Sequence, residues 1–91
     1  MKTLKSFWEE HPDAEGPLRA WYTEAKRVNW SGPQAIKTAY RTATILRNNR
    51  VVFIKGNAYR LVVAVKYEFQ VVYIRFIGTH AEYDKIKAEE V

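Results

Sequence analysis

The 91-residue sequence contains no cysteine, few glycines and prolines, and no long apolar run. Without cysteine, no disulfide can cross-link the fold, and no thiolate can bind a metal or act as a nucleophile. A membrane span needs about 20 consecutive apolar residues, and a secretory signal needs a shorter apolar stretch near the start. The chain has neither, so we expect a cytoplasmic protein without membrane attachment.

Acidic residues are almost missing from the middle of the chain. Residues 37–75 carry eight basic side chains and one acid, Glu68, whereas the flanking segments are neutral or acidic. A basic block of this kind indicates a face that binds a polyanion. The alternative, that the lysines and arginines only solvate loops and edge strands, stays open on charge alone.

Length and composition predict a single domain over residues 1–91. Nearly half of the residues, 47%, are hydrophobic, which is enough for one core in a chain with little room for a second. Apolar residues at helical spacing predict three helices, over residues 3–10, about 13–28 and 33–40. The next segment, residues 42–49, is expected to be irregular.

The second half of the chain changes to a strand pattern. Segments rich in Val, Ile, Tyr and Phe predict three strands, over residues 50–55, 58–68 and 70–77. A last helix is expected from Thr79 to about Glu90. This order predicts an α+β fold with N-terminal helices on a small three-stranded antiparallel meander, followed by a short C-terminal helix.

Alternation along the strands predicts which side chains share a face of the sheet. A tight turn at residues 69–70 would put Arg75 opposite Ala64, and Phe76 on the apolar face beneath the helices. The other face then collects three cations and a tyrosine, namely Arg60, Lys66, Tyr73 and Arg75. Guanidinium groups bind phosphate through parallel hydrogen bonds, and lysine acts as a point charge. A merely solvated face is the alternative, although it would favour acidic and uncharged polar residues as well.

The segment after the last predicted strand has the spacing of a capping box, with Thr79 and Glu82 three residues apart. A helix is therefore expected to begin with His80, and Tyr83 and Asp84 follow on the same side of it. His80 is the candidate general acid or base. In the structural alternative, His80 is simply exposed, Tyr83 packs on the sheet and Asp84 pairs with a nearby base.

Two long stretches carry a resemblance to a known family. Residues 55–63, KGNAYRLVV, and residues 72–86, VYIRFIGTHAEYDKI, resemble the HigB toxins, a branch of the RelE-like superfamily, as do the helical residues 4–14 and 18–22. The resemblance implies the toxin of a type II toxin–antitoxin system. Such toxins enter the ribosomal A site and cut messenger RNA with the RNA's own 2′-hydroxyl, without a cofactor or metal. The implied partners are mRNA, the ribosome and a HigA-like helix-turn-helix antitoxin.

The resemblance also implies roles for residues of this chain. The candidate catalytic residues are His80, Arg75, Arg60 and Tyr83. The candidate RNA-binding residues are Lys66, Lys55, Tyr73 and Asn57. The two arginines would clamp a phosphate, the histidine would move protons, and the tyrosine would orient or stack on a base. Asn57 also fits a simple turn residue of the first hairpin.

Two departures from the family pattern keep a second interpretation open. Only Met1 and Lys2 precede the first predicted helix, where the family carries a short strand, and one polar residue fewer separates Phe53 from Ile54. Either difference would alter the edge of the sheet or the register of the first hairpin. The alternative function is a non-catalytic, basic nucleic-acid-binding module or an inactive toxin homologue.

Overall fold

The structure, a computed structural model, describes residues 2–55 and 58–91, and the expected turn at Asn57 lies outside these ranges. Its elements are α1 (Lys2–Glu10), a 3-10 helix η1 (Pro12–Ala14), α2 (Glu15–Ala25), α3 (Pro33–Ala39), β1 (Thr44–Ile45), β2 (Arg50–Lys55), β3 (Tyr59–Lys66), β4 (Val71–Thr79) and α4 (His80–Tyr83). Helices, then an antiparallel meander, then a short helix confirm the α+β prediction. No helix within the described ranges is long and apolar enough to cross a membrane.

The sheet contains four antiparallel strands in the order β1-β2-β3-β4, one more than expected. The additional strand is β1, only two residues long, in a segment predicted to be irregular. It pairs with β2, and β2 pairs with β3 from Arg50–Ala64 to Lys55–Tyr59 without a shift of register. The pairing of β2 with β3 is therefore regular over the described residues, although the chain lacks the polar residue that the family carries between Phe53 and Ile54.

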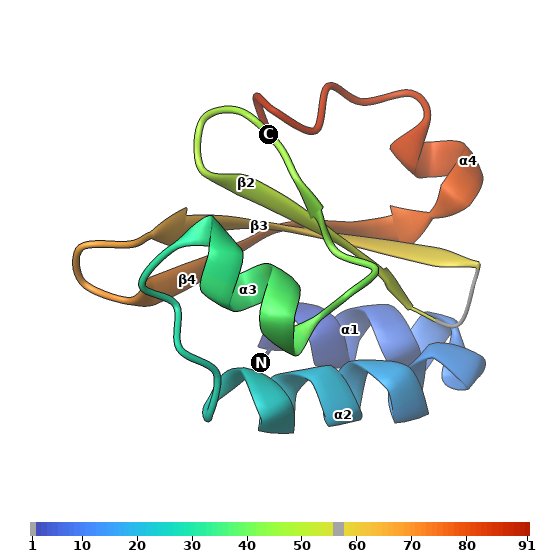
Figure 1. The fold of residues 1–91 in the computed structure, drawn as a ribbon. Coiled ribbons are helices and arrows are strands. Elements are labelled where there is room, and N and C mark those ends of the chain that lie inside the picture. Colours follow the sequence, from blue (N-terminus) through green and yellow to red (C-terminus); the bar gives the residue numbers. More distant parts are fainter. Residues whose placement is uncertain (1, 56–57) are drawn as a thin grey trace.

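The molecule has three layers, with the helices α1, α2 and α3 on one side of the sheet and residues 84–91 on the other (Figure 1). We call residues 84–91 the C-terminal strap. The main core lies between the helices and the sheet, and its largest fully buried side chains are Leu4, Leu18, Ile36, Val51, Leu61, Val63 and Val65. Helical spacing explains the contribution of α1, because residues four apart, such as Leu4 and Trp8, share a face.

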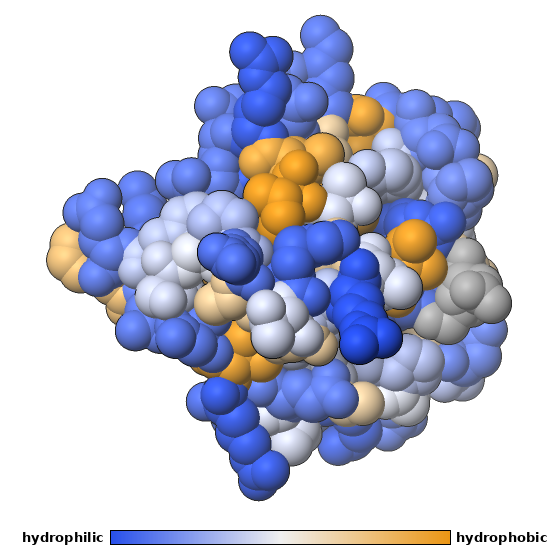
Figure 2. All heavy atoms as spheres, viewed as in Figure 1, coloured by the Kyte–Doolittle hydropathy of each residue, from blue (hydrophilic) through white to orange (hydrophobic). Residues whose placement is uncertain are grey.

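A second, smaller apolar cluster lies on the other side of the sheet. Val52 and Val62 are buried there beneath Ala88 of the C-terminal strap, and the side chains packed around them are Leu46, Phe76, Tyr83 and Val91. Figure 2 shows that apolar residues on the viewed surface form small separate patches among hydrophilic ones. The strap thus covers the centre of the face on which the cations were expected.

The turn between β3 and β4 differs from the prediction. It spans residues 67–70 rather than two residues, and Gln70 adopts a left-handed conformation with φ of 52°. Ala64 consequently lies opposite Tyr73, not opposite Arg75. A shift of two residues leaves the alternation of faces unchanged, so the hydrophobic pattern could not distinguish the two registers.

A β-bulge interrupts the pairing of β3 with β4 and corrects the placement of Phe76. Val63 pairs with Ile74 and Val62 pairs with Phe76, so Arg75 is the extra residue of β4. Beyond the bulge the faces are exchanged. Phe76 therefore packs in the small cluster under the C-terminal strap instead of beneath the helices.

The C-terminal helix is much shorter than expected. The predicted capping box is confirmed, since Glu82 N donates to Thr79 Oγ1 at 3.2 Å and Thr79 N donates to Glu82 Oε1 at 2.8 Å. The helix nevertheless ends at Tyr83 instead of continuing to Glu90. The strap turns back so that Ala88 packs on the sheet, and this apolar burial outweighs the helix propensity of the Lys, Ala and Glu residues around it.

Candidate nucleic-acid interface

Strand β3 places Arg60 and Lys66 on the side of the sheet that the C-terminal strap crosses. They share this face with Val62 because alternate residues of a strand point the same way. Arg60 is half-buried, and its Nη1 donates to the main-chain oxygen of Tyr59 at 3.1 Å. Lys66 follows Arg60 by six positions of the strand, or roughly 20 Å. Arg60 and Lys66 therefore share one face of the sheet, as predicted. Lys66 nevertheless lies too far away to act on the same phosphate as Arg60.

The bulge determines the direction of Arg75. Bulges re-aim side chains, and here the exposed Arg75 turns toward the C-terminal strap. Its Nε donates to the main-chain oxygen of Val91 at 3.3 Å, while the adjacent Phe76 packs in the small cluster with Val52, Val62 and Ala88. Arg75 therefore lies on the predicted face. The bulge puts it there, and not the simple alternation of side chains along the strand.

Arg50 is a cation of this face that the sequence analysis missed. Its Nε donates to Val91 O at 2.9 Å, and its Nη1 donates to Asn48 O at 2.7 Å. In the ladder, Arg50 lies opposite Ala64. The predicted hairpin gave no signal for this placement. A two-residue turn at residues 56–57 pairs Lys55 with Ala58 and puts Arg50 opposite Val63 on the helix side, whereas the ladder pairs Lys55 with Tyr59.

The C-terminal strap is held on this face by a few identifiable contacts. Ala88 is 9% exposed against Val52 and Val62. The side chain of Asn48 donates from Nδ2 to the main-chain oxygen of Glu89 at 3.1 Å. Together with the two arginine bonds to Val91, these contacts keep the centre of the cationic face covered.

Helix α4 places the candidate proton-transfer group at its first residue. His80 is exposed, and its Nε2 lies 3.6 Å from Oδ1 of Asp84, one turn further on. The main-chain N–H of His80 donates to Ala58 O at 2.9 Å, which ties the start of α4 to the hairpin before β3. Tyr83, by contrast, is half-buried in the small cluster. His80 is thus accessible to a substrate, whereas Tyr83 packs as the structural alternative proposed.

The capping box also affects the charge at the start of α4. Hydrogen bonds from Thr79 hold the pKa of the Glu82 carboxyl below its usual value, first through its main-chain N–H and then through its side chain. A carboxylate near a helix N-terminus is favourable because it faces the free N–H groups. The ionised Glu82 carboxylate is therefore favoured at the start of the helix that carries His80.

Lys55 lies apart from the other candidate residues. It is on the helix side of the sheet, where its Nζ lies 5.4 Å from the centre of the Tyr40 ring. Burial lowers the pKa of the Lys55 ammonium, against a smaller opposing effect of Glu24. Burial, with a further contribution from Glu24, raises the pKa of Tyr40 to about 12. The structure therefore does not bring Lys55 together with Arg60 and Arg75.

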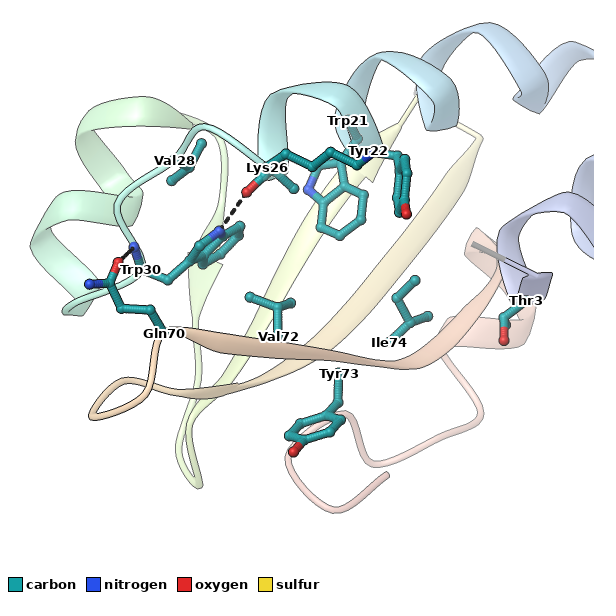
Figure 3. A pocket seen from close by; sticks show the side chains of 11 residues that line it. Thr3, Trp21, Tyr22, Lys26, Val28, Trp30, Gln70, Val72, Tyr73 and Ile74 are labelled. Carbon is teal, nitrogen blue, oxygen red and sulfur yellow. Dashed lines mark hydrogen bonds between the residues drawn. The ribbon is translucent and has the colours of Figure 1, made fainter.

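A cavity of about 600 Å³ lies on the helix side, between α2 and the edge strand β4 (Figure 3). Its walls include Trp21, Trp30 and Ile74, and the indole Nε1 of Trp30 donates to Ala25 O at 2.8 Å. Tyr73 also borders the cavity, but its ring points to the opposite side of β4 and is 50% exposed (Figure 3). Tyr73 thus belongs with the cationic face, and the cavity is separate from it.

The cationic face offers two kinds of chemistry to a ligand. The guanidinium groups can bind and stabilise negative charge, and the exposed imidazole of His80 can transfer a proton. Among the described residues, no three His, Asp or Glu side chains gather in a way that could hold a metal ion. The side chains of this face therefore suit a substrate that carries phosphate.

The fold and this face define a class: small α+β proteins with a meander sheet and arginines gathered on the face away from the helices. A family model described as HigB_toxin, RelE-like toxic component of a toxin-antitoxin system, matches residues 14–86. The chain therefore belongs to the HigB toxin family, as the resemblance implied. A search of curated proteins finds no match to it. A toxin of a toxin–antitoxin system implies an antitoxin as its partner.

Proposed function

We propose that this chain is an endoribonuclease that cleaves messenger RNA without a metal and arrests translation. The observation that carries the proposal is that β3 and β4 bring Arg60 close to the start of α4, where the imidazole of His80 lies. Arg60 lies opposite Gly78, two residues before His80, and β4 continues directly into α4. Arg75 precedes Gly78 on the same strand. A phosphate held by Arg60 would therefore lie near a group that can move protons.

The proposed reaction uses a nucleophile that the substrate supplies. The RNA 2′-oxygen attacks the adjacent phosphorus, the P–O5′ bond breaks, and the products are a 2′,3′-cyclic phosphate and a 5′-hydroxyl. One proton leaves the 2′-hydroxyl and one reaches the departing 5′-oxygen, and His80 serves as the acid or base for these transfers. Arg60 and Arg75 stabilise the charge that develops on the phosphate oxygens. Asp84 Oδ1 lies 3.6 Å from His80 Nε2, near enough to orient the imidazole ring.

The proposed setting is the A site of the cytoplasmic ribosome, which would position the message across the cationic face. The basic middle of the chain, residues 37–75, supports binding to a particle rich in phosphate. The antitoxin is proposed to be a HigA-like helix-turn-helix protein. A short gene for such a protein beside this one would support the assignment.

The proposal is tested by inducing the wild type and matched variants in cells and mapping the 5′ ends of messages. We expect Arg75→Ala to lower cleavage by about 10- to 100-fold, since a charge-assisted phosphate contact is lost. His80→Ala is expected to lower it by about 10²- to 10⁴-fold, the usual range for a general acid or base. Arg27→Ala removes an exposed arginine after α2, away from the cationic face, and should cut like the wild type.

Two results would contradict the nuclease assignment. If the folded wild type neither arrests growth nor produces new 5′ ends, the chain is not an active toxin. If His80→Ala remains fully toxic with unchanged message ends, the cationic face acts as a non-catalytic nucleic-acid-binding module.

A further inference from the structure

Two arginines from different strands converge on one oxygen atom. The main-chain oxygen of Val91 accepts hydrogen bonds from Arg50 Nε at 2.9 Å and Arg75 Nε at 3.3 Å. Arg50 lies on β2 and Arg75 on β4, with β3 between them. Guanidinium groups bind phosphate oxygens through charge-assisted hydrogen bonds, and two of them together suit an anion better than either alone. Val91 O therefore occupies a place in which a phosphate oxygen could accept the same two hydrogen bonds.

The local structure prepares Arg50 for this role. Its Nη1 donates to Asn48 O at 2.7 Å, which directs the guanidinium group over the sheet. Asn48 holds that oxygen in place because it adopts a left-handed conformation with φ of 58°. The same residue donates from its side chain to Glu89 O in the C-terminal strap. Asn48 thus orients the arginine and fastens the strap that covers it.

The C-terminal strap is the least strongly held layer of the molecule. It contains no regular helix or strand in the described structure, and it meets the sheet mainly through Ala88 and Val91. The helices on the other side bury a much larger set of side chains. Segments with few buried apolar contacts open at lower free energy than the rest of a protein. The strap can therefore leave the sheet without unfolding the main core.

We propose that Arg50 and Arg75 form a phosphate-binding pair for RNA, and that the C-terminal strap occupies this pair until RNA displaces Val91. The inference rests on the proposed function in taking RNA as the ligand. It adds Arg50 to the binding residues and makes the strap a competitor that is built into the chain. The closed strap lowers the apparent affinity for RNA, because that affinity equals the intrinsic affinity multiplied by the fraction of molecules in which the pair is open.

The test compares strap-loosening variants in binding to a short 2′-O-methyl RNA, whose blocked 2′-oxygen prevents cleavage. Asn48→Gly keeps the left-handed conformation and removes the hydrogen bond to Glu89. Its control is Asn49→Gly, because Asn49 has φ of 59° and, among the described residues, no side-chain hydrogen bond to the strap. A second variant, Ala88→Gln, pushes the strap off the sheet without a change of charge, and its control is the exposed Ala20→Gln.

We expect Asn48→Gly and Ala88→Gln to bind the RNA about three- to tenfold more tightly than their controls, which corresponds to the net loss of one strap contact. In an Arg50→Ala background this gain in RNA affinity should disappear. Its loss would show that tighter binding depends on the arginine pair. Tryptophan fluorescence verifies the fold, since Trp8, Trp21 and Trp30 all belong to the helix-side core and lie away from the strap.

Equal or weaker binding by the loosened variants would overturn the inference, and so would a gain that persists without Arg50. These outcomes are separable from the fate of the proposed function. If messages are cut in cells but the loosened variants bind no tighter, the nuclease assignment stands and the strap is not a competitor. If the gain depends on Arg50 but no message is cut, the phosphate-binding pair stands and the nuclease assignment fails.

Discussion

The two faces of the sheet differ in how they are covered and in what they carry. The helix side packs three α-helices over a continuous core in which buried residues of α1, α2, α3, β2 and β3 meet. Among the described residues, the strap side has a cluster of three buried residues, Val52, Val62 and Ala88, and two arginines donate hydrogen bonds to Val91 beside it. The helix side supplies stability, and the strap side keeps charged groups near the surface at a smaller cost in desolvation.

This contrast shows how a chain of 91 residues can hold both a stable core and a cationic site. Burying an unpaired guanidinium group is costly, so the arginines are tolerated only where the cover is thin and offers main-chain oxygens as acceptors. A second full helical layer would leave them without solvent or partners. The thin cover is therefore a condition for the site rather than an incomplete fold.

Neighbouring valines on β3 allow the sharpest comparison of the two faces. Val63 and Val62 are both fully buried, one under the helices and the other under the C-terminal strap. Val63→Ala should lower the free energy of unfolding by about 2 to 3 kcal/mol, through lost burial and a cavity that rigid helices cannot fill. Val62→Ala should cost about 1 kcal/mol, since the strap can settle into the space. Urea unfolding of both variants measures the difference, and equal losses would mean that the strap is as rigid as the helices.

A close approach at Gly78 gives the next largest expected effect. A Cβ at this position would lie 2.6 Å from the Cζ atom of Phe76 and 3.0 Å from Glu82 Oε1. Gly78→Ala should therefore displace the Phe76 ring and cost about 1 to 2 kcal/mol in thermal or urea unfolding. Gly16→Ala, in a helix with open space around it, should instead gain about 0.5 kcal/mol. A Gly78→Ala variant as stable as the wild type would show that the strap side tolerates larger side chains than its packing indicates.

The capping box at the start of α4 predicts a smaller effect confined to the strap side. Thr79→Ala removes the acceptor for the Glu82 N–H and should cost about 1 kcal/mol, whereas Thr79→Ser retains the hydroxyl and should cost less. Hydrogen exchange at the amides of α4 and the strap should quicken in the alanine variant, with β2 and β3 unchanged. Faster exchange throughout the sheet would instead indicate that the two faces unfold together.

The pH dependence of the same motif is the smallest predicted effect. Because the folded protein holds the pKa of Glu82 below its usual value of 4.5, the carboxylate stabilises α4 above that pH. This stabilisation is lost as the pH falls below 4.5 and through the lowered pKa. The amide resonance of Thr79, which donates to Glu82, should follow this titration and should stay flat in Glu82→Gln. A midpoint at or above 4.5 would show that the capping carboxylate is not bound as described.

Local patterns predicted the elements well, because each is set by residues close in sequence. Pro12 ends the first helix, the capping box begins α4, and Arg50–Lys55 is the predicted strand. The two-residue strand β1 escaped prediction because it is too short for an alternating pattern. The strap escaped because its helix-forming composition is overridden by packing of Ala88 on distant valines.

The candidate site was predictable in composition but not in detail. Alternation placed Arg60 and Lys66 on one face, yet it could not show the bulge at Arg75 or the exchange of faces at Phe76, since a bulge leaves no period in the sequence. Arg50 was missed because a two-residue turn at residues 56–57 would put it opposite Val63 on the helix side, and the ladder is shifted by one residue from that register. That His80, Arg60 and Arg75 act on RNA stays a prediction for the variants proposed above.

The bulge at Arg75 has a further consequence for the behaviour of the protein in concentrated solution. Strand β4 forms an edge of the sheet, and an edge strand of nine residues is a ready template for pairing with a second copy. A bulge breaks the even spacing of N–H and C=O groups along that edge, and the guanidinium group beside it adds charge. The residue proposed to bind phosphate therefore also protects the chain against edge-to-edge aggregation. Arg75 variants that lose activity should be examined for turbidity before the loss is assigned to catalysis.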